Sequence, residues 1–220
     1  MNEAKQIVHF RGCDNLVVAP ITKDVDEENG YVTGAVIPLA PLGSVSKTTE
    51  SSSEPIFYDN ASALTIMAEG TDEIKLTVPA LSLDKLALVT SKTIDSETGV
   101  YIDSQPRVKY YALGYREKLT DSTYRYTWRL KGTFSIPEES SNTEDDSTES
   151  NGQELTYTGI HTTHRFAKAS QDDEGRWVKG TAKGVIADER DKKCDLSAFF
   201  DEVTTPDTTK PLTPPTPPEA

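Results

Sequence analysis

The sequence predicts a mainly β protein, a β-sandwich or partly closed barrel, with one flanking α-helix. The first observation is that apolar and polar residues alternate from Tyr124 to Ile136, as expected when successive side chains of a strand point to opposite faces. A second, shorter alternation runs from Ile74 to Val78. The third is a single stretch with helical spacing, Leu83–Thr90. We therefore expect one β domain over residues 1–203.

The Tyr124–Ile136 segment is the most informative part of the chain. Its apolar face is expected to carry Tyr124, Tyr126, Trp128, Leu130, Phe134 and Ile136. Its polar face carries Arg125, Arg129 and Lys131. At about 3.3 Å per residue such a strand spans about 40 Å, well beyond the usual length of about five or six residues. The excess length suggests a sheet that continues onto something else.

Shorter alternating or β-branched runs, separated by turn residues, indicate the remaining strands. They are expected at Ile7–Phe10, Leu16–Val18, Ile74–Val78, Val100–Asp103, Arg107–Leu119, Glu154–Ala167 and Arg176–Ala187, with Ile56–Met67 as a mixed further candidate. Pro38 and Pro41 confine Val32–Leu42 to an edge strand or an irregular arm. Ser44–Ser53, with seven Ser or Thr in ten residues, is expected to be a long loop.

The one convincing helix follows the Ile74–Val78 strand directly. Leu83, Leu86 and Ala87 recur at three- and four-residue spacing. Ser82 is a suitable N-cap, and Asp84 lies in the first turn, where a negative charge is favourable. We expect this helix to close one end of the core.

Charge and proline are concentrated in two segments outside the expected core. Glu138–Glu154 holds seven acidic residues and no Lys or Arg, which predicts an exposed flexible loop. Thr204–Ala220 holds six of the 13 prolines and is expected to form a disordered or polyproline-like tail. The net charge of the whole chain is −13, and no basic stripe typical of nucleic-acid binding is present.

Compartment signals are few. The N-terminus lacks the apolar stretch of a signal peptide, and no run approaches the roughly 20 apolar residues of a membrane span. We expect a soluble protein made in a reducing cytoplasm, without membrane contact. Cys13 and Cys194 show no metal-binding spacing and are expected to be free thiols.

No motif predicts catalysis, a metal or a cofactor. Asp24–Gly30 imitates the start of a calcium loop, but its glycine falls one position late and Ala35 replaces the closing glutamate. His161 and His164 are three residues apart, so on a regular strand they face opposite sides. Phosphate loops, nucleophile elbows and zinc-protease helices do not occur in the sequence. We therefore expect no enzymatic activity.

Five residues are candidates for contacts between subunits. Arg125, Arg129 and Lys131 form either a solvated face or a basic surface that pairs with acidic segments of adjacent subunits, and we favour the second. Gly180 and Gly184 mark either a bulge or bend, or the close approach of another backbone, such as that of a neighbouring subunit.

Three segments together carry a resemblance to a known family. They are the strand and helix of Ile74–Ala87, the segment Tyr110–Gly114 and the strand Tyr126–Phe134. Their order, over about residues 6–200, resembles the major tail tube proteins of long, non-contractile-tailed bacteriophages, especially those that infect Gram-positive bacteria. The acidic segment and the Pro-rich tail fall outside the shared core.

The resemblance implies a β-sandwich or partly closed barrel flanked by one helix. It implies a structural virion protein whose hexameric rings stack into a tail tube, assembled in the host cytoplasm and located in the virion tail. Implied partners are other copies of the chain, a tape-measure protein, tail terminator and distal tail proteins, and viral DNA passing through the lumen without sequence-specific binding. No active site or cofactor is implied. Since the chain is acidic, we also expect an acidic lumen wall that repels DNA phosphates.

The alternative is a monomeric β-sandwich binding module, such as a surface or carbohydrate-binding domain. Such a module needs a compact patch of exposed aromatic side chains. Candidates for that patch are Tyr110, Tyr111, Tyr124, Tyr126 and Trp128.

Overall fold

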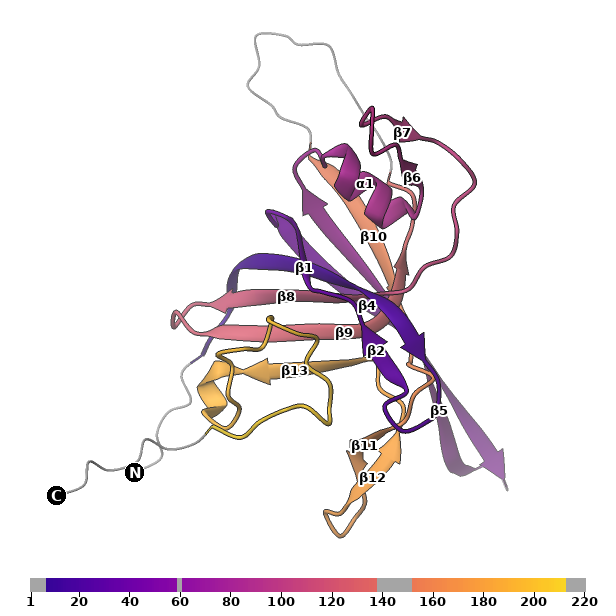
Figure 1. Ribbon diagram of the computed structural model, residues 1–220. Helices are drawn as coiled ribbons and strands as arrows, with labels where there is room; N and C mark the ends of the chain where they lie inside the picture. The colour runs from indigo at the N-terminus through magenta and orange to yellow at the C-terminus, as the bar shows by residue number, and fades with distance from the viewer. Residues whose placement is uncertain (1–6, 59–60, 138–151, 213–220) are drawn as a thin grey trace, which may run out of the picture.

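The computed structural model describes residues 7–58, 61–137 and 152–212 (Figure 1). The prediction of a mainly β fold with one helix is confirmed, since 52% of the chain is strand and 6% helical. The strands are β1 (Phe10–Asp24), β2 (Tyr31–Thr33), β3 (Ile37–Ala40), β4 (Ser44–Tyr58), β5 (Ala61–Val78), β6 (Thr93–Ile94), β7 (Tyr101–Ile102), β8 (Tyr111–Leu119), β9 (Tyr124–Phe134), β10 (Gln153–Gly159), β11 (Phe166–Gln171), β12 (Trp177–Gly180) and β13 (Gly184–Asp188).

The main sheet has nine antiparallel strands and curls into a half-barrel. Its path is β2-β1-β8-β9-β10-β5-β4, with β3 added beside β1 and β13 beside β9. Because β3 pairs with β1 and then leads through residues 41–43 into β4, one continuous stretch of chain links two distant strands of the curl. The hairpins β6–β7 and β11–β12 lie outside this sheet.

Strand β9 is the branching point of the sheet. One of its edges pairs with β8. Its other edge is shared, because Arg125–Arg129 pairs with β13 and Gly132–Phe134 pairs with β10. Between these two stretches the Leu130 amide donates to the Lys183 carbonyl at 2.8 Å. One edge of the long strand β9 therefore pairs with two other strands of the same chain, β13 and β10.

Two apolar clusters cover opposite faces of β1, β8 and β9. The inner cluster, inside the curl, contains Leu16, Val18, Leu39, Ile74, Leu76, Val78, Val89, Leu113, Tyr115, Leu155 and Tyr157. The outer cluster contains Val17, Ala19, Ala112, Trp128, Leu130, Phe166, Phe199 and Val203. Alternate residues of these strands thus enter different clusters, which buries both faces of the sheet.

The prediction of one buried and one polar face for β9 holds only in part. Trp128 and Leu130 are fully buried, as expected. However, Arg129 and Lys131, both expected on the polar face, are only 6% and 9% exposed. The pairing with β8 shifts register between Arg129 and Gly132, so the regular alternation of faces is broken there. At the C-terminal end of the predicted strand, Ile136 is 59% exposed and lies beyond β9.

The outer cluster is closed by the C-terminal part of the chain, which contains turns but few regular elements. The Trp128 indole Nε1 donates to the Phe199 carbonyl at 2.8 Å, and Phe200 stacks on Tyr126 with ring centroids 5.6 Å apart. Further along, Pro211 forms a β-bridge with Cys194. The prediction that the chain is a disordered tail from residue 204 onward is therefore wrong for 204–212, while 213–220 lie outside the described residues.

The predicted helix is present as α1 (Leu83–Thr90). Ser82 occupies the N-cap position, although its side chain makes no capping hydrogen bond there. Ser91 ends the helix in the left-handed conformation with φ 56°. Val89 enters the inner cluster, and the Leu88 carbonyl accepts a 2.7 Å hydrogen bond from the Tyr111 hydroxyl. The helix covers one end of the curl, as expected.

Several predicted boundaries were wrong. The Ser/Thr-rich segment Ser44–Ser53 is not a loop but the first part of β4. The two short N-terminal strands are replaced by the single strand β1, and β8 begins at Tyr111 rather than Arg107. The two last predicted strands each divide in two, into β10 and β11 and into β12 and β13. Most of the acidic segment, residues 138–151, lies outside the described residues.

Two other expectations concern the thiols and the membrane. Cys13 and Cys194 are free cysteines, as predicted. Among the helices in the described ranges, none has the length and apolar character needed to cross a membrane.

Truncation distinguishes the packed residues 204–212 from those beyond them. We expect removal of 204–220 to lower the free energy of unfolding by about 2–4 kcal/mol. It removes the Asp207 carboxylate that accepts from the Ala167 and Lys168 amides, and the backbone groups of Lys210 and Leu212 that bond to Asp195 and Lys193. Urea unfolding of both truncations measures this, with removal of 213–220 as the matched control. Equal unfolding midpoints for the two truncations would contradict the packing role of 204–212.

Candidate functional site

The β4–β5 hairpin extends far beyond the sheet to which it belongs. β10 pairs with β5 only from Asp72 to Val78, whereas β4 pairs with β5 along its whole length. Residues 61–71 of β5 therefore have β4 as their one strand neighbour in the described chain, over about 35 Å at about 3.3 Å per residue. Figure 1 shows this part, hereafter the ribbon, projecting away from the half-barrel.

The ribbon lacks a core of its own where its exposure is described. Residues 50–55 of β4 and 68–70 of β5 are all exposed. An isolated two-stranded hairpin is at best marginally stable in water. Contact with another protein surface would therefore stabilise the ribbon. In its distal part, Ile56 of β4 is paired with Leu64 of β5. These features are typical of an element that meets another surface.

β4 is also a terminal strand of the main sheet. Its outer edge therefore has no strand partner in the parts of the chain that the structure describes. A long edge with unpaired backbone groups is a template for pairing with another chain. Lys47, Glu50 and Pro55 interrupt this edge with charge and with a residue that has no amide donor.

A buried acid fixes the base of the ribbon. Asp72, where β5 leaves β10, is 1% exposed. Its Oδ2 lies 3.0 Å from Arg129 Nη1 on β9, and its Oδ1 lies 3.5 Å from Lys183 Nζ beside β13. From β4, Lys47 Nζ approaches Oδ2 to 3.7 Å and Thr49 Oγ1 donates to Oδ1 at 2.8 Å. One carboxylate of β5 thus joins β4, β9 and the residue that precedes β13.

More cationic than anionic side chains surround the Asp72 carboxylate. Burial disfavours its ionised form, but the Thr49 hydroxyl and the cations Arg129, Lys47 and Lys183 outweigh that effect and hold the pKa of Asp72 below its ordinary value. Lys183 shares its ammonium group between Asp72, the Glu69 carboxylate at 2.7 Å and the Gly70 carbonyl at 2.5 Å. The site is therefore rich in cations and depends on Asp72 remaining charged.

A second acid, Asp24, holds Lys131 in place. Its Oδ2 accepts from Lys131 Nζ at 2.5 Å and from the Thr163 amide at 2.8 Å, and its Oδ1 accepts from the His164 amide at 2.8 Å. Burial again opposes ionisation, yet the hydrogen bonds from Lys131, Thr163 and His164 lower the pKa of Asp24. This cluster ties the end of β1 to β9 and to the segment between β10 and β11.

The third basic residue of β9 is paired as well. Arg125 Nη2 lies 3.2 Å from Asp188 Oδ2 on β13, and its guanidinium lies 4.9 Å from the centre of the Phe10 ring. Arg190 also binds Asp188 at 2.6 Å, and this guanidinium, with Arg125, holds the pKa of Asp188 well below its usual range.

The structure thus gives all three basic residues acidic partners in the same chain. Arg129 and Lys131 are buried, so the expectation of a solvated face is wrong for them, while their contact with an adjacent subunit stays a prediction. Arg125 is partly exposed, and its contact with another subunit stays a prediction. No local sequence pattern predicts these pairs, because the partner acids belong to other strands far along the chain.

Gly184 and Gly180 serve close approaches within the chain. A Cβ at Gly184 would lie 2.4 Å from the Trp128 carbonyl oxygen of β9, which no side chain tolerates. At Gly180 a Cβ would lie 3.2 Å from the Ala169 Cβ. The close-approach interpretation is therefore right for Gly184, but the approaching backbone belongs to the same chain. A role for either glycine between subunits stays a prediction.

The other candidate groups are dispersed. His161 Nδ1 lies 3.3 Å from the Thr181 hydroxyl, whereas His164 Nδ1 lies 3.2 Å from the Val25 carbonyl. Asp24, the first acid of the calcium-like segment, is engaged by Lys131. Within residues 7–58, 61–137 and 152–212, no group of three or more His, Cys, Asp or Glu side chains is arranged to hold a metal ion.

A groove that was not predicted from the sequence lies beside β2. It has a volume of about 970 Å³ and is lined by β2, by the start of β11 and by residues 201–208. These three segments are far apart in the chain, and the fold of 201–208 was not foreseen, so no local pattern pointed to the groove.

Comparison with known proteins found no family model that matches the chain and no curated protein that is similar to it. The function of the chain is therefore inferred from its own residues and geometry.

Substitution of Asp72 tests the buried cluster. We expect Asp72→Asn to lower the free energy of unfolding by about 3–5 kcal/mol, because Arg129 is then buried without a counter-charge and Lys183 keeps only the Glu69 carboxylate. Urea unfolding measures the effect. Glu73→Gln, one residue further on and exposed, is the matched control and should change stability by less than about 0.5 kcal/mol. Equal losses in the two variants would show that Asp72 does not hold the strands together.

The free energy of unfolding should fall as the pH is lowered into the acid range. The pKa values of Asp24 and Asp72 are lowered in the folded state. Their contribution is therefore complete above the unfolded value of about 3.9 and is lost as the pH falls below it, because the unfolded chain takes up protons first. Urea unfolding between about pH 7 and pH 3 should show this decline.

A double variant isolates these two groups. Glu117 acts in the opposite direction, since burial raises its pKa. Asp24→Asn/Asp72→Asn leaves Glu117 and Asp188 unchanged. It should make the decline below about pH 4 less steep, and Asp188, whose pKa is also lowered, accounts for part of what remains. A decline as steep as in the unmodified chain would assign the acid sensitivity to other carboxylates.

Proposed function

We propose that this chain is a structural virion protein, the subunit of a phage tail tube, which forms stacked, hexameric rings through which DNA passes into the host. The observation that carries the proposal is the ribbon, which leaves the half-barrel as a bare two-stranded element and presents a terminal strand edge. A subunit of this kind exposes a two-stranded segment that its own core does not cover.

Assembly into a closed ring would remove that exposed edge. Unpaired edges promote aggregation unless they are covered or closed, and cyclic assembly closes them. Rings require each subunit to hold its contact element in a fixed direction. The Asp72 cluster supports this requirement, because it joins the base of the ribbon to β9 and to Lys183 beside β13.

The family resemblance supports the same proposal. It implies a mainly β subunit with one flanking helix, and such a fold is observed. Under this proposal the partners are further copies of the chain, a tape-measure protein, tail terminator and distal tail proteins. The protein acts in the virion tail after assembly in the host cytoplasm.

DNA is proposed to pass through the lumen without specific binding. Arg129 and Lys131 are each neutralised by a buried aspartate of the same subunit, so they add little free positive charge to any surface. This is compatible with an acidic lumen wall, from which DNA phosphates are repelled.

The alternative, a monomeric binding module, loses its main argument. Two of the five aromatic residues proposed for an exposed patch, Tyr111 and Trp128, are fully buried. Tyr126 packs against Phe199 and Phe200 at centroid distances of 5.5 and 5.6 Å. These rings build the core, and a compact aromatic patch is not formed by this set.

Shortening the ribbon tests the proposed function. Replacing residues 51–69 by an Asn-Gly turn retains the part of the hairpin that packs on β10 and removes the rest. We expect the full chain to form rings or tubes in negative-stain images at high concentration, and the shortened chain to stay monomeric under the same conditions.

Unfolding by urea serves as the control, since the shortened variant should keep its midpoint within error. Rings or tubes of the shortened chain, at the concentration that suffices for the full chain, would contradict the role of the ribbon.

A further inference from the structure

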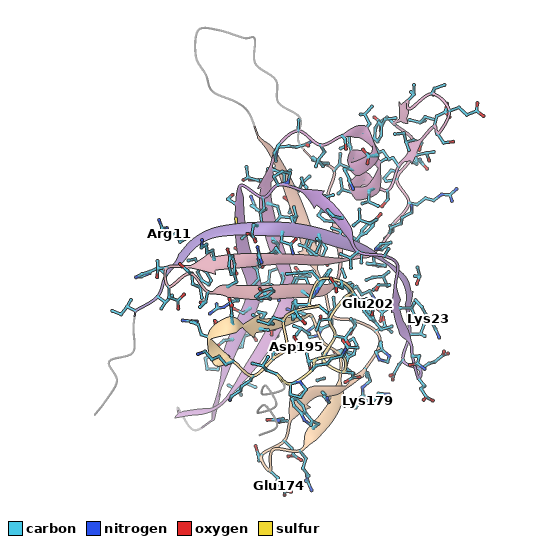
Figure 2. The ribbon with its side chains drawn as sticks, turned by 60° about the vertical axis from the view of Figure 1, so that its left-hand side comes forward. Arg11, Lys23, Glu174, Lys179, Asp195 and Glu202 are labelled. Carbon is cyan, nitrogen blue, oxygen red and sulfur yellow. The ribbon has the colours of Figure 1, made fainter. Side chains whose placement is uncertain are left out.

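The groove beside β2 is a preformed channel between two segments distant in sequence. One wall is formed by β2 and the residues around it, from Glu27 to Val36, and the other by residues 201–208. Arg165 and Lys179 lie at the side of the β11–β12 hairpin. Glu202 and Lys179, from different parts of the lining, are labelled in Figure 2.

The floor of the groove is apolar and rigid. Phe166 and Val203, with exposures of 2% and 7%, belong to the outer cluster. The Tyr31 ring meets Phe166 edge to face at 5.6 Å, and its hydroxyl donates to the Leu130 carbonyl at 2.5 Å. Because these rings are fixed by the core below them, a ligand would find the floor already shaped.

The rim of the groove is acidic. Five carboxylates and two cations line it. Glu28, Asp201 and Glu202 are exposed and have no ion pair in the portion of the chain that the structure describes. β2 is a terminal strand, so its backbone offers pairing groups to an extended segment. The groove therefore suits an extended chain with basic and apolar side chains.

The same protein presents such a segment elsewhere. Residues 104–110, between β7 and β8, are all exposed and belong to no strand. Within it the Val108 side chain is 79% exposed and therefore open to contact from another molecule. Pro106 favours an extended backbone at Gln105 before it. In an extended chain, Arg107 and Lys109 point to one side and Val108 to the other.

We propose that the groove of one copy accepts residues 104–109 of a neighbouring copy. Val108 packs on the floor between Phe166 and Val203, and Arg107 and Lys109 reach the acidic rim. The contact is heterologous, joining two different surfaces of the same protein, and such contacts build rings or filaments. This inference rests on the proposed self-assembly, to which it adds an interface separate from the ribbon.

A labelled peptide of residues 104–110 tests the groove directly. It should bind the full-length chain, and binding should weaken as salt is added. Asp201→Lys/Glu202→Lys, at exposed positions, should weaken binding by about tenfold or more. A peptide with Arg107→Glu and Lys109→Glu should not bind. Equal binding of both peptides, or binding unaffected by the rim variant, would overturn the proposal.

Charge exchange in the full chain tests the contact in the assembly. Arg107→Glu/Lys109→Glu should raise the concentration needed for assembly by about tenfold or more, measured by light scattering. Mixing it with the Asp201→Lys/Glu202→Lys chain should restore assembly, because each then complements the other. Arg11→Glu/Lys118→Glu makes the same charge change at exposed positions away from the groove and should have no effect (Figure 2 labels Arg11).

The two experiments separate this inference from the proposed function. If the unmodified chain assembles but the charge exchange changes nothing and the peptide does not bind, the groove contact is wrong and the assembly stands. If the unmodified chain stays monomeric while the peptide binds, the groove is a binding site for basic extended segments of a different partner. In that case both the tail-tube function and the self-contact are overturned.

Discussion

The structure depends on the burial of a single carboxylate, Asp72, inside the curled sheet. It lies where β5 leaves β10 and meets Arg129 of β9, Lys183 beside β13 and Lys47 of β4. Burying charges in a protein interior is costly, and the cost is offset only when each charge finds its partner. Because these partners come from β9, from β4 and from the residue that precedes β13, the curl and the direction of the ribbon are fixed together.

The structure gives a different explanation for the length of the central strand β9. Its length suggests a sheet that overhangs its own core, yet β9 divides its edge between β10 and β13 and is covered on both faces. The element that does overhang is the β4–β5 ribbon. The strand residues that lack a neighbouring strand therefore belong to the Ser/Thr-rich β4–β5 hairpin and not to the aromatic strand β9. The argument for assembly rests on that hairpin.

Local sequence patterns predicted those elements whose formation depends on neighbouring residues in the chain. The alternation around Trp128 and the helical spacing of Leu83–Thr90 each placed an element correctly. Ser44–Ser53 was mistaken for a loop because its polar residues show no alternation, and its strand is stabilised by pairing with β5 instead. The burial of Lys131 could not be predicted from local sequence, because its partner Asp24 is 107 residues away.

The central claim is that the ribbon is the part of this protein that other copies cover. Hydrogen–deuterium exchange of the full chain, compared between dilute monomer and concentrated assembly, measures this at the level of single segments. Backbone amides of residues 51–58 in β4 should exchange rapidly in the monomer and become protected in the assembly, while those of β8 stay equally protected in both. Assembled protein whose β4 amides exchange as fast as in the monomer would contradict the claim.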